Sequence, residues 1–472
     1  MFSFKSLRKT ATANGIKRLI YCFHNRVIGQ VFLGKQDASL KPQLTLFDAI
    51  VTGLAAILGA GIFTIIAPAA GLAGPAILVS FGIAAFVAFC NASSSIQLAA
   101  VFPRSGGTYE FGRRMLGNWW GFIAGWMFLV ANTVGPGVSA LAFGSYLHAL
   151  WPIIPFHVAA IGAAAVMVIL DAVGIRRSIR VTGVIVILSI ASLLAVAIIA
   201  LPSAHLGNFS PFAPGGLVGV LRATGLLFFA YTGYSRIATL VEEVKNPKRT
   251  IPRASLIALG GVTFLYLFVV GTAIAVLGAS GMASSPSPLE ALMIAVGSAL
   301  GVALVAGGAL LTTFNEGLSD LLGVSRVAFS MGRERDLPAG LAKLGAEKNP
   351  WRSLIFVGAI TLLVAAFAPL VLSVAISSFG TLLYYSITNV SALKLPRVQR
   401  TFPRALAIAG LAGCLGLAFA LSPQYIAIGL LILGVGAVYY IIRRRMIQKK
   451  ACYLSCSFLL EHIIKILFNC SV

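Results

Sequence analysis

Charge is what this sequence has least of. Only 10% of its 472 residues are charged, and just 13 of those are acidic. A typical soluble domain carries roughly 25% charged residues, because charged side chains are needed to cover a surface of this size. The scarcity therefore excludes a soluble enzyme, and the 58% of hydrophobic residues excludes a disordered chain.

Cysteine is also scarce, with six residues. None of them falls in a predicted external loop, so we expect no disulfide, and a secreted disulfide scaffold is excluded. Cys452 and Cys456 lie four residues apart without histidine at zinc spacing, so we expect no metal site. No phosphate-binding glycine loop indicates an ATPase. We expect no enzyme activity, no catalytic residue and no cofactor.

Long apolar runs fill most of the chain. A helix that crosses a bilayer needs roughly 20 mostly apolar residues, and the runs do not alternate with the period of a strand. The fold class we predict is an all-α integral membrane protein with twelve transmembrane helices. The predicted spans are 46–68, 76–100, 119–149, 156–175, 181–201, 219–241, 254–278, 290–322, 353–371, 373–393, 405–421 and 424–442.

The basic residues gather on one side of this predicted membrane. Twelve spans place both termini on one side, and the segments there hold 34 of the 36 Lys and Arg residues. The other two, Arg222 and Arg236, fall within the sixth span. The positive-inside rule then predicts cytoplasmic termini in a cell (plasma) membrane. The net charge of +23 is thus a topology signal, and we expect no nucleic-acid partner.

Five parts follow from this topology. They are a basic cytoplasmic N-terminal tail (1–45), a first five-helix repeat (46–201), a second, inverted repeat (219–393), helices eleven and twelve (405–442) and a cytoplasmic C-terminal tail (443–472). The N-terminal tail carries no secretory signal. An amphipathic stretch near 15–33 and the apolar stretch 451–472 are expected to lie on membrane lipid.

Two predicted spans are interrupted by glycine near their middle. The first reads Gly59-Ala60-Gly61, and the sixth carries Gly233 among polar residues. Glycine costs about 1 kcal/mol relative to alanine inside a helix, so it serves either close packing or local unwinding. Because five helices make each half, the halves are inverted, and matching interrupted spans point to a transporter site. Unwound amides would accept a carboxylate and unwound carbonyls an ammonium group.

At these residues the chain resembles the amino acid–polyamine–organocation (APC) superfamily of amino acid permeases, which has the leucine-transporter fold. That fold is a standard example of discontinuous helices. The resemblance runs from about residue 44 to residue 395, and the last two helices match by number only. Its five motifs lie at 46–48 with 59–63, 102–109, 229–233, 242–254, and 325–331 with Leu337-Pro338.

The resemblance implies a leucine-transporter-like 5+5 inverted repeat plus two helices, and it assigns roles to the interrupted spans. Amides around Ala60 and Gly61 would hold a substrate carboxylate, while backbone carbonyls would hold its ammonium group. Tyr231 and Tyr234 are candidate pocket or gate aromatics, with interhelical packing as the open alternative. The substrate-binding residues so implied are Ile57, Gly59, Ala60, Gly61, Phe229, Ala230, Thr232 and Gly233.

Three charged residues inside predicted spans are candidates for coupling transport to an ion. Glu316 and Asp320 lie four apart on one helix face, where two close carboxylates would tend to share a proton. Arg236 needs an acidic partner, and Glu316 is the one we prefer. Alternatively, Asp320 pairs with Arg326 or Arg236 near a helix end expected at Gly323. The fifth span has no Lys, unlike some proton-coupled relatives.

Two further acids have structural interpretations. Asp48 is expected to stabilise the start of the first helix. Asp171 is expected to form an ion pair with Arg176 near the inner end of the fourth span. Together these observations predict a secondary active transporter for an amino acid or related amine, working by alternating access with proton symport. An exchanger is the alternative, followed by a sensor or channel on the same scaffold.

Overall fold

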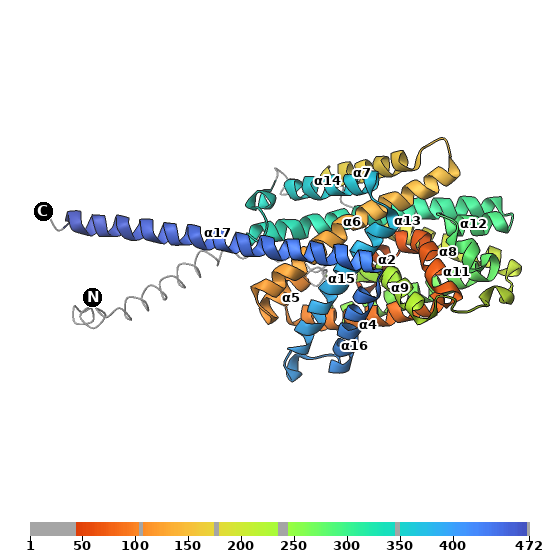
Figure 1. The fold of residues 1–472 in the computed structure, drawn as a ribbon, viewed down its shortest axis with the longest axis horizontal. Helices are drawn as coiled ribbons and strands as arrows, with labels where there is room; N and C mark the ends of the chain where they lie inside the picture. Colours follow the sequence, from red (N-terminus) through yellow and green to blue (C-terminus); the bar gives the residue numbers. More distant parts are fainter. Residues whose placement is uncertain (1–43, 103–106, 174–178, 235–243, 345–349, 470–472) are drawn as a thin grey trace. The chain divides into compact units, whose positions relative to one another are not determined.

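The computed structural model describes residues 44–102, 107–173, 179–234, 244–344 and 350–469, and in these ranges every regular element is a helix (Figure 1). The elements are α2 (Leu46–Ile57), η2 (Gly61–Ile65), α3 (Ile66–Ala73), η3 (Gly74–Ala76), α4 (Ile77–Val101), α5 (Thr108–Met115), α6 (Asn118–Leu150), α7 (Phe156–Ala172), α8 (Ile179–Ala200), η4 (Leu201–Ser203), η5 (Leu206–Phe209), α9 (Gly216–Leu227), η6 (Phe228–Tyr234), α11 (Pro247–Ala283), α12 (Pro288–Ala295), α13 (Ala299–Arg333), η7 (Ala339–Ala342), α14 (Trp351–Phe367), α15 (Leu370–Leu393), η8 (Arg397–Gln399), α16 (Arg404–Ala420) and α17 (Pro423–Asn469). The predicted all-α class is confirmed.

Eight helical stretches in the described ranges are long and apolar enough to cross a membrane. The first of them, Leu46–Val101, contains two of the predicted spans, and the shorter apolar helices α7, α14 and α16 coincide with three others. The chain is therefore a multi-pass helical membrane protein. The count of twelve helices and the inverted five-helix repeat stay predictions.

Helix α6 lies inside the bundle and packs against several other helices. It contacts α5, α7, α13, α14, α15 and α17, and α7 and α14 lie side by side next to it (Figure 1). Small residues allow these close approaches. At Gly380 of α15, for example, an added Cβ would lie 2.9 Å from the Cβ of Ala131 on α6.

The first helix, α2, begins at a capping box. The Asp48 backbone N–H donates to the Thr45 hydroxyl (3.3 Å), and the Asp48 carboxylate accepts from the Thr45 backbone N–H (2.8 Å). These bonds satisfy donors that the first helical turn leaves free. The predicted role of Asp48 at the start of the first helix is confirmed.

The same helix stops halfway along the first predicted span. Leu58 has an extended backbone (φ −73°, ψ 112°), and the chain resumes as the π-helix η2 and then as α3. The matching span also changes geometry, because α9 gives way to the 3₁₀-helix η6 at Phe228. Unwinding, one of the two alternatives for Gly59-Ala60-Gly61, therefore occurs at Leu58 and Gly59.

The eighth predicted span differs from the structure at both ends. It was expected as one helix over 290–322, but Gly297 has a positive φ (72°) that ends α12, and the Ser298 side chain caps α13. The expected stop near Gly323 is wrong, since α13 continues to Arg333. A glycine inside a helix weakens it by only about 1 kcal/mol, and neighbouring helices hold this one together.

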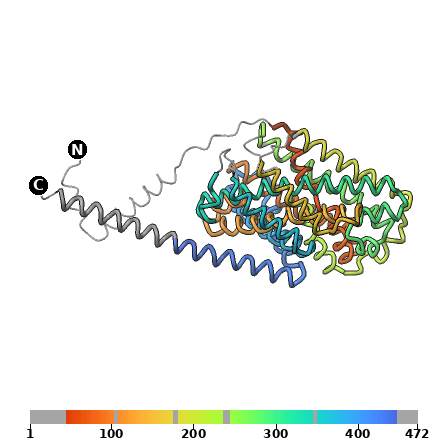
Figure 2. Tube along the Cα trace, turned by 90° about the horizontal axis from the view of Figure 1, so that it is seen from above, coloured from red at the N-terminus to blue at the C-terminus, as the bar shows by residue number. Residues whose placement is uncertain are grey.

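The last helix runs beyond its predicted limit at residue 442. Helix α17 extends to Asn469, and Figure 2 shows its first part, in blue, as one unbroken helix. Neither proline nor glycine occurs between 443 and 469 to end it.

Candidate functional site

The break in α2 frees a backbone donor at the centre of the first span. Because Leu58 is extended, the amide N–H of Ala60 does not bond back along α2. It donates instead to Glu316 Oε2 of α13, at 2.7 Å. A hydrogen bond from a backbone amide to a carboxylate is among the stronger kinds in proteins. The structure thus joins two predicted features, the interrupted helix and the intramembrane acid.

Glu316 is buried at this position, with 7% of its surface exposed. The same carboxylate oxygen accepts a second hydrogen bond, from the Ser139 hydroxyl of α6 at 2.7 Å. Both of these donors are electrically neutral. Glu316 is thereby held at the junction of α2, α6 and α13.

Gly59 is what allows the carboxylate to lie so close to the backbone. A Cβ atom added at Gly59 would overlap the Glu316 side-chain carboxylate. No residue with a side chain fits there unless Glu316 moves. Gly59 therefore serves the position of Glu316 in addition to the unwinding of α2.

The other two predicted glycines bring α2 and η6 together. A Cβ at Gly61 would lie 2.5 Å from the Cβ of Ala230, and one at Gly233 would overlap the backbone carbonyl of Ala56. Ala56 and Gly233 thus pack backbone against backbone. The packing alternative therefore holds for Gly61 and Gly233, while the unwinding alternative holds next to Gly59.

The carbonyls predicted to bind an ammonium group each accept a hydroxyl hydrogen bond. Tyr266 donates to the Ile57 carbonyl (3.0 Å), and Thr232 donates to that of Phe229 (2.9 Å). Tyr385 donates to the carbonyl of Thr232 (3.3 Å). A carbonyl oxygen has two lone pairs, so each keeps capacity for a second donor.

The two candidate gate aromatics are buried within the bundle. Tyr234 stacks on Tyr385, with ring centroids 5.1 Å apart, and Tyr231 packs edge-on against Phe81 and Tyr266. Both rings therefore take part in interhelical packing. Their pocket or gate role stays a prediction.

Asp320 lies one turn beyond Glu316 against the same neighbouring helix. A Cβ at Gly135 of α6 would come within 2.8 Å of Asp320 Oδ2, and Asp320 is 8% exposed. Arg326, one of its proposed partners, is exposed. Arg236 and Arg176 lie outside the described residues, so the predicted pairs of Arg236 with Glu316 or Asp320, and of Arg176 with Asp171, stay predictions.

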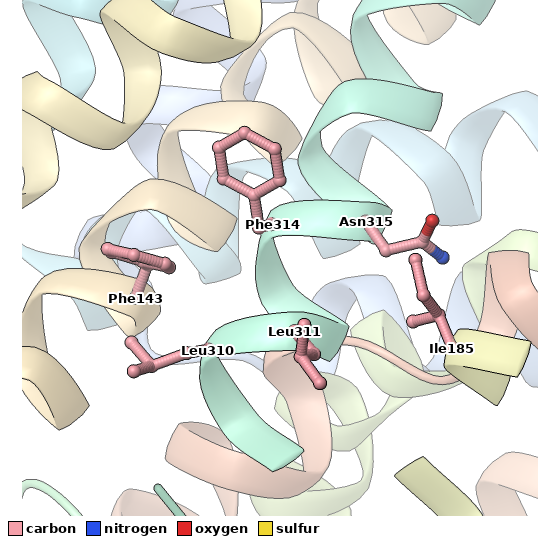
Figure 3. A pocket seen from close by; sticks show the side chains of 6 residues that line it. All are labelled: Phe143, Ile185, Leu310, Leu311, Phe314 and Asn315. Atoms are coloured by element: carbon pink, nitrogen blue, oxygen red, sulfur yellow. The ribbon is translucent and has the colours of Figure 1, made fainter. Parts of the chain in front are cut away.

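An apolar cavity of about 170 Å³ lies beside this region between α6, α8 and α13. In Figure 3, Phe143 and Leu310 stand on one side of it and Ile185 and Asn315 on the other. A second cavity of similar volume contains Arg222 of α9. Neither is lined by the predicted substrate-binding residues, and the Glu316 carboxylate lies against Gly59 at the break in α2.

A second buried acid, Asp336, follows the end of α13. Its Oδ2 accepts from the Tyr109 hydroxyl of α5 at 2.6 Å. That hydroxyl accepts from Arg113 Nη1 (2.9 Å), and Arg113 also forms an ion pair with Glu334 (3.0 Å). Burial raises the pKa of Asp336, although Tyr109 and Arg113 oppose the shift. This Tyr109–Asp336 cluster ties α5 to the loop after α13.

Sequence reasoning gave this cluster no role. Tyr109 is the last residue of the motif at 102–109 and Leu337 belongs to the motif that ends at Pro338, and neither motif assigns a role to the acids after α13. The available signal was the spacing of Tyr109 and Arg113, which share one helix face. Their partners lie more than 200 residues away, at separations of 227 and 221.

Glu290 is a further residue that the sequence did not bring forward. It is 4% exposed on α12, and its Oε2 has no hydrogen-bond partner in the described part of the chain. Nearby, the Tyr146 hydroxyl donates to the Phe63 carbonyl of η2 at 2.8 Å. An acid in the first turn of an otherwise apolar helix was the available signal.

Known proteins resemble this chain along most of its length. A family model described as amino acid permease matches residues 44–456. An uncharacterised transporter of Mycobacterium tuberculosis is 41% identical over 408 residues, covering 86% of this chain and 92% of that protein. The branched-chain amino acid permease of Bacillus subtilis is 30% identical over 404 residues, covering 81% and 87%. The methylthioribose transporter of Bacillus subtilis is 26% identical over 408 residues, covering 80% and 87%.

Proposed function

The chain belongs to the amino acid permease family, and from that premise we propose that it moves an amino acid or related amine across the plasma membrane by alternating access with proton symport. Permease relatives are transporters, which agrees with the expectation of a non-enzyme. One of the Bacillus subtilis relatives is named for branched-chain amino acids and the other for methylthioribose. Membership in this family therefore does not identify the substrate, and the proposal of an amino acid depends on the chemistry of the site.

The observation that carries the proposal is the amide of Ala60 at the break in α2. It donates to a buried carboxylate at 2.7 Å, which supports the break as a position where a carboxylate can be bound. The free carboxylate of an amino acid has the same chemistry. Carbonyls of Ile57, Phe229 and Thr232 lie on the two interrupted segments and suit an ammonium group.

We propose Glu316 as the proton-coupling residue, with Asp320 as the second candidate and Arg236 as their partner. Intramembrane acids of this kind commonly carry protons in transporters. Glu316 is supported by its bond to the break itself. The rest of the proposal places both termini in the cytoplasm and membrane lipid around the bundle.

The test is uptake by the purified protein in liposomes. Each common amino acid is offered at an external pH of about 5.5 or 7.5, with and without a protonophore. We expect saturable uptake of at least one amino acid that increases at low external pH and collapses with the protonophore. Uptake only into liposomes preloaded with substrate would identify an exchanger, and currents far above transporter turnover would identify a channel.

A further inference from the structure

We infer that an amino acid binds by replacing Glu316 at the amide of Ala60, and that Glu316 takes up a proton as it gives up this bond. The inference rests on the proposed function and deepens it. It makes Glu316 an internal carboxylate that occupies the substrate's carboxylate position until a proton neutralises it.

The substrate carboxylate and the Glu316 carboxylate would occupy the same position. The Ala60 N–H is the amide expected to hold a substrate carboxylate, and Glu316 Oε2 already accepts from it at 2.7 Å. The Glu316 carboxylate also lies against Gly59, where a Cβ would overlap it. A substrate carboxylate cannot reach the break until the Glu316 carboxylate moves away.

Hydrogen-bond donors and titratable groups lie on the elements around Glu316. The Ala60 amide and the Ser139 hydroxyl, both neutral, donate to its carboxylate. The titratable or charged groups on the neighbouring elements are Asp48 on α2, Tyr146 and His148 on α6, His157 and Asp171 on α7, Arg180 on α8, Tyr231 and Tyr234 on η6, Lys248, Arg249, Arg253 and Tyr266 on α11, Glu290 on α12, Asp320, Arg326 and Arg333 on α13, and Arg352 on α14. Among them, Asp320 follows one turn later on the same helix and is also acidic.

Proton uptake by Glu316 offsets the negative charge that the substrate carboxylate adds. An entering zwitterion adds one carboxylate next to Glu316 and Asp320, and like charges at close range raise the proton affinity of the group. Glu316 then accepts a proton from water on the side from which the substrate enters. The Ala60 N–H transfers its hydrogen bond from Glu316 to the substrate carboxylate, and no covalent bond forms other than the O–H bond. Release of the substrate reverses both changes.

This scheme distinguishes substrates by their carboxylate. An amine without a carboxylate does not compete for the Ala60 amide, and its ammonium group can pair with ionised Glu316. It therefore binds without proton uptake. Glu316 thus couples protons to amino acids and leaves their decarboxylated amines uncoupled.

The experiment measures protons taken up on binding to the purified full chain. Leucine and isopentylamine, and lysine and cadaverine, are titrated calorimetrically at about pH 7 in two buffers that differ in ionisation enthalpy. We expect about one proton per amino acid bound and none per amine. In Glu316→Gln the amino acid should bind with no proton uptake, while the matched variant Asp336→Asn, at a buried acid outside the site, should keep it.

A second variant guards against a Glu316→Gln protein that does not fold. Ser139→Ala removes a donor to the Glu316 carboxylate, so amino acid binding should become tighter at neutral pH, by about 10- to 150-fold for a hydrogen bond to a charged group. Proton uptake with the amines, or its persistence in Glu316→Gln, would overturn the inference while leaving transport intact. Binding of neither amino acid would instead contradict the proposed function.

Discussion

Two buried acids, Glu316 and Asp336, differ in the groups that donate hydrogen bonds to them. Glu316 lies in the middle of α13, and Asp336 follows its end. Each is less than a tenth exposed and accepts a short hydrogen bond, of 2.7 Å and 2.6 Å respectively. Glu316 bonds to an amide and a serine hydroxyl, whereas Asp336 bonds to Tyr109, which is itself held by Arg113.

The difference lies in what a change of charge would cost. If Glu316 gains a proton, neither the Ala60 amide nor the Ser139 hydroxyl that donates to it is left with an uncompensated charge. If Asp336 gains one, the Arg113 and Glu334 pair loses a neighbouring negative charge. Neutralising one member of a buried network of charged groups usually destabilises the folded protein. The first arrangement therefore suits a group that changes partner during a cycle, and the second suits a fixed connection.

The largest expected effect tests the Glu316 side of this contrast sterically. Gly59→Ala places a methyl group where the Glu316 carboxylate lies. Overpacking of this kind costs about 1–3 kcal/mol, so uptake should fall by about 10- to 100-fold. The measurement is initial uptake rate in liposomes at equal protein content.

Two variants make that result specific. Gly261→Ala, at a position with nothing within 4 Å, should transport normally. The double variant Gly59→Ala with Glu316→Ala should recover folding and substrate binding, because the overlapping side chain is gone. If the double variant is as impaired as the single one, the clash with Glu316 is not the cause.

The next effect separates the two acids by their role in transport. Wild-type uptake should increase as external pH falls, by up to about tenfold per unit for one titrating proton. Glu316→Gln should flatten this profile, because the exchanging proton is lost. Asp336→Asn should keep the slope even if its overall rate is lower. A flat profile in Asp336→Asn would remove the distinction between the two acids.

A smaller effect tests the fixed connection through stability. Tyr109→Phe deletes the hydroxyl that donates to Asp336 and accepts from Arg113. A buried acceptor left without its donor costs about 1–3 kcal/mol, so the thermal midpoint of the detergent-solubilised protein should fall. Tyr440→Phe, whose ring packs on Trp119, is the matched control and should change the midpoint less.

The smallest effect concerns the pH dependence of that stability. Burial raises the pKa of Asp336 above its ordinary value, so the folded state binds this proton more tightly than the unfolded state. The resulting stabilisation is present at low pH and is lost as pH rises through the folded pKa. Asp336→Asn should therefore show a smaller gain in thermal midpoint than wild type as pH is lowered from about 7 to about 5. An identical gain in both proteins would contradict the shift at Asp336.

The sequence predicted the helices and the interrupted spans because both depend on local composition. Apolar runs identify membrane helices, and Gly59 marks the break in α2. It could not predict that Ala60 pairs with Glu316, since the two lie 256 residues apart and only the packing of α2, α6 and α13 brings them together. The predicted partner Arg236 lies outside the described residues, and the Ala60 amide and Ser139 hydroxyl that donate to Glu316 could not be foreseen from local spacing.

Local rules also failed where the surrounding bundle decides the outcome. Gly323 was expected to end a helix, but it has ordinary helical geometry within α13. Gly297 does end one, because its positive φ is a conformation that side chains rarely adopt. Each of the two is a glycine within an apolar run, so the local sequence does not show which of them ends a helix. Tyr109 and Asp336 were missed for a related reason, since their pairing depends on tertiary packing.

The overlap between Gly59 and Glu316 has a consequence for how related sequences can diverge. Position 59 can accept a side chain only if position 316 becomes shorter or turns away. The two positions should therefore vary together among relatives, with glycine at the first wherever a glutamate stands at the second. A relative with alanine at position 59 and a small residue at position 316 would have exchanged an internal carboxylate for an open amide, and with it the dependence of its substrate binding on protons.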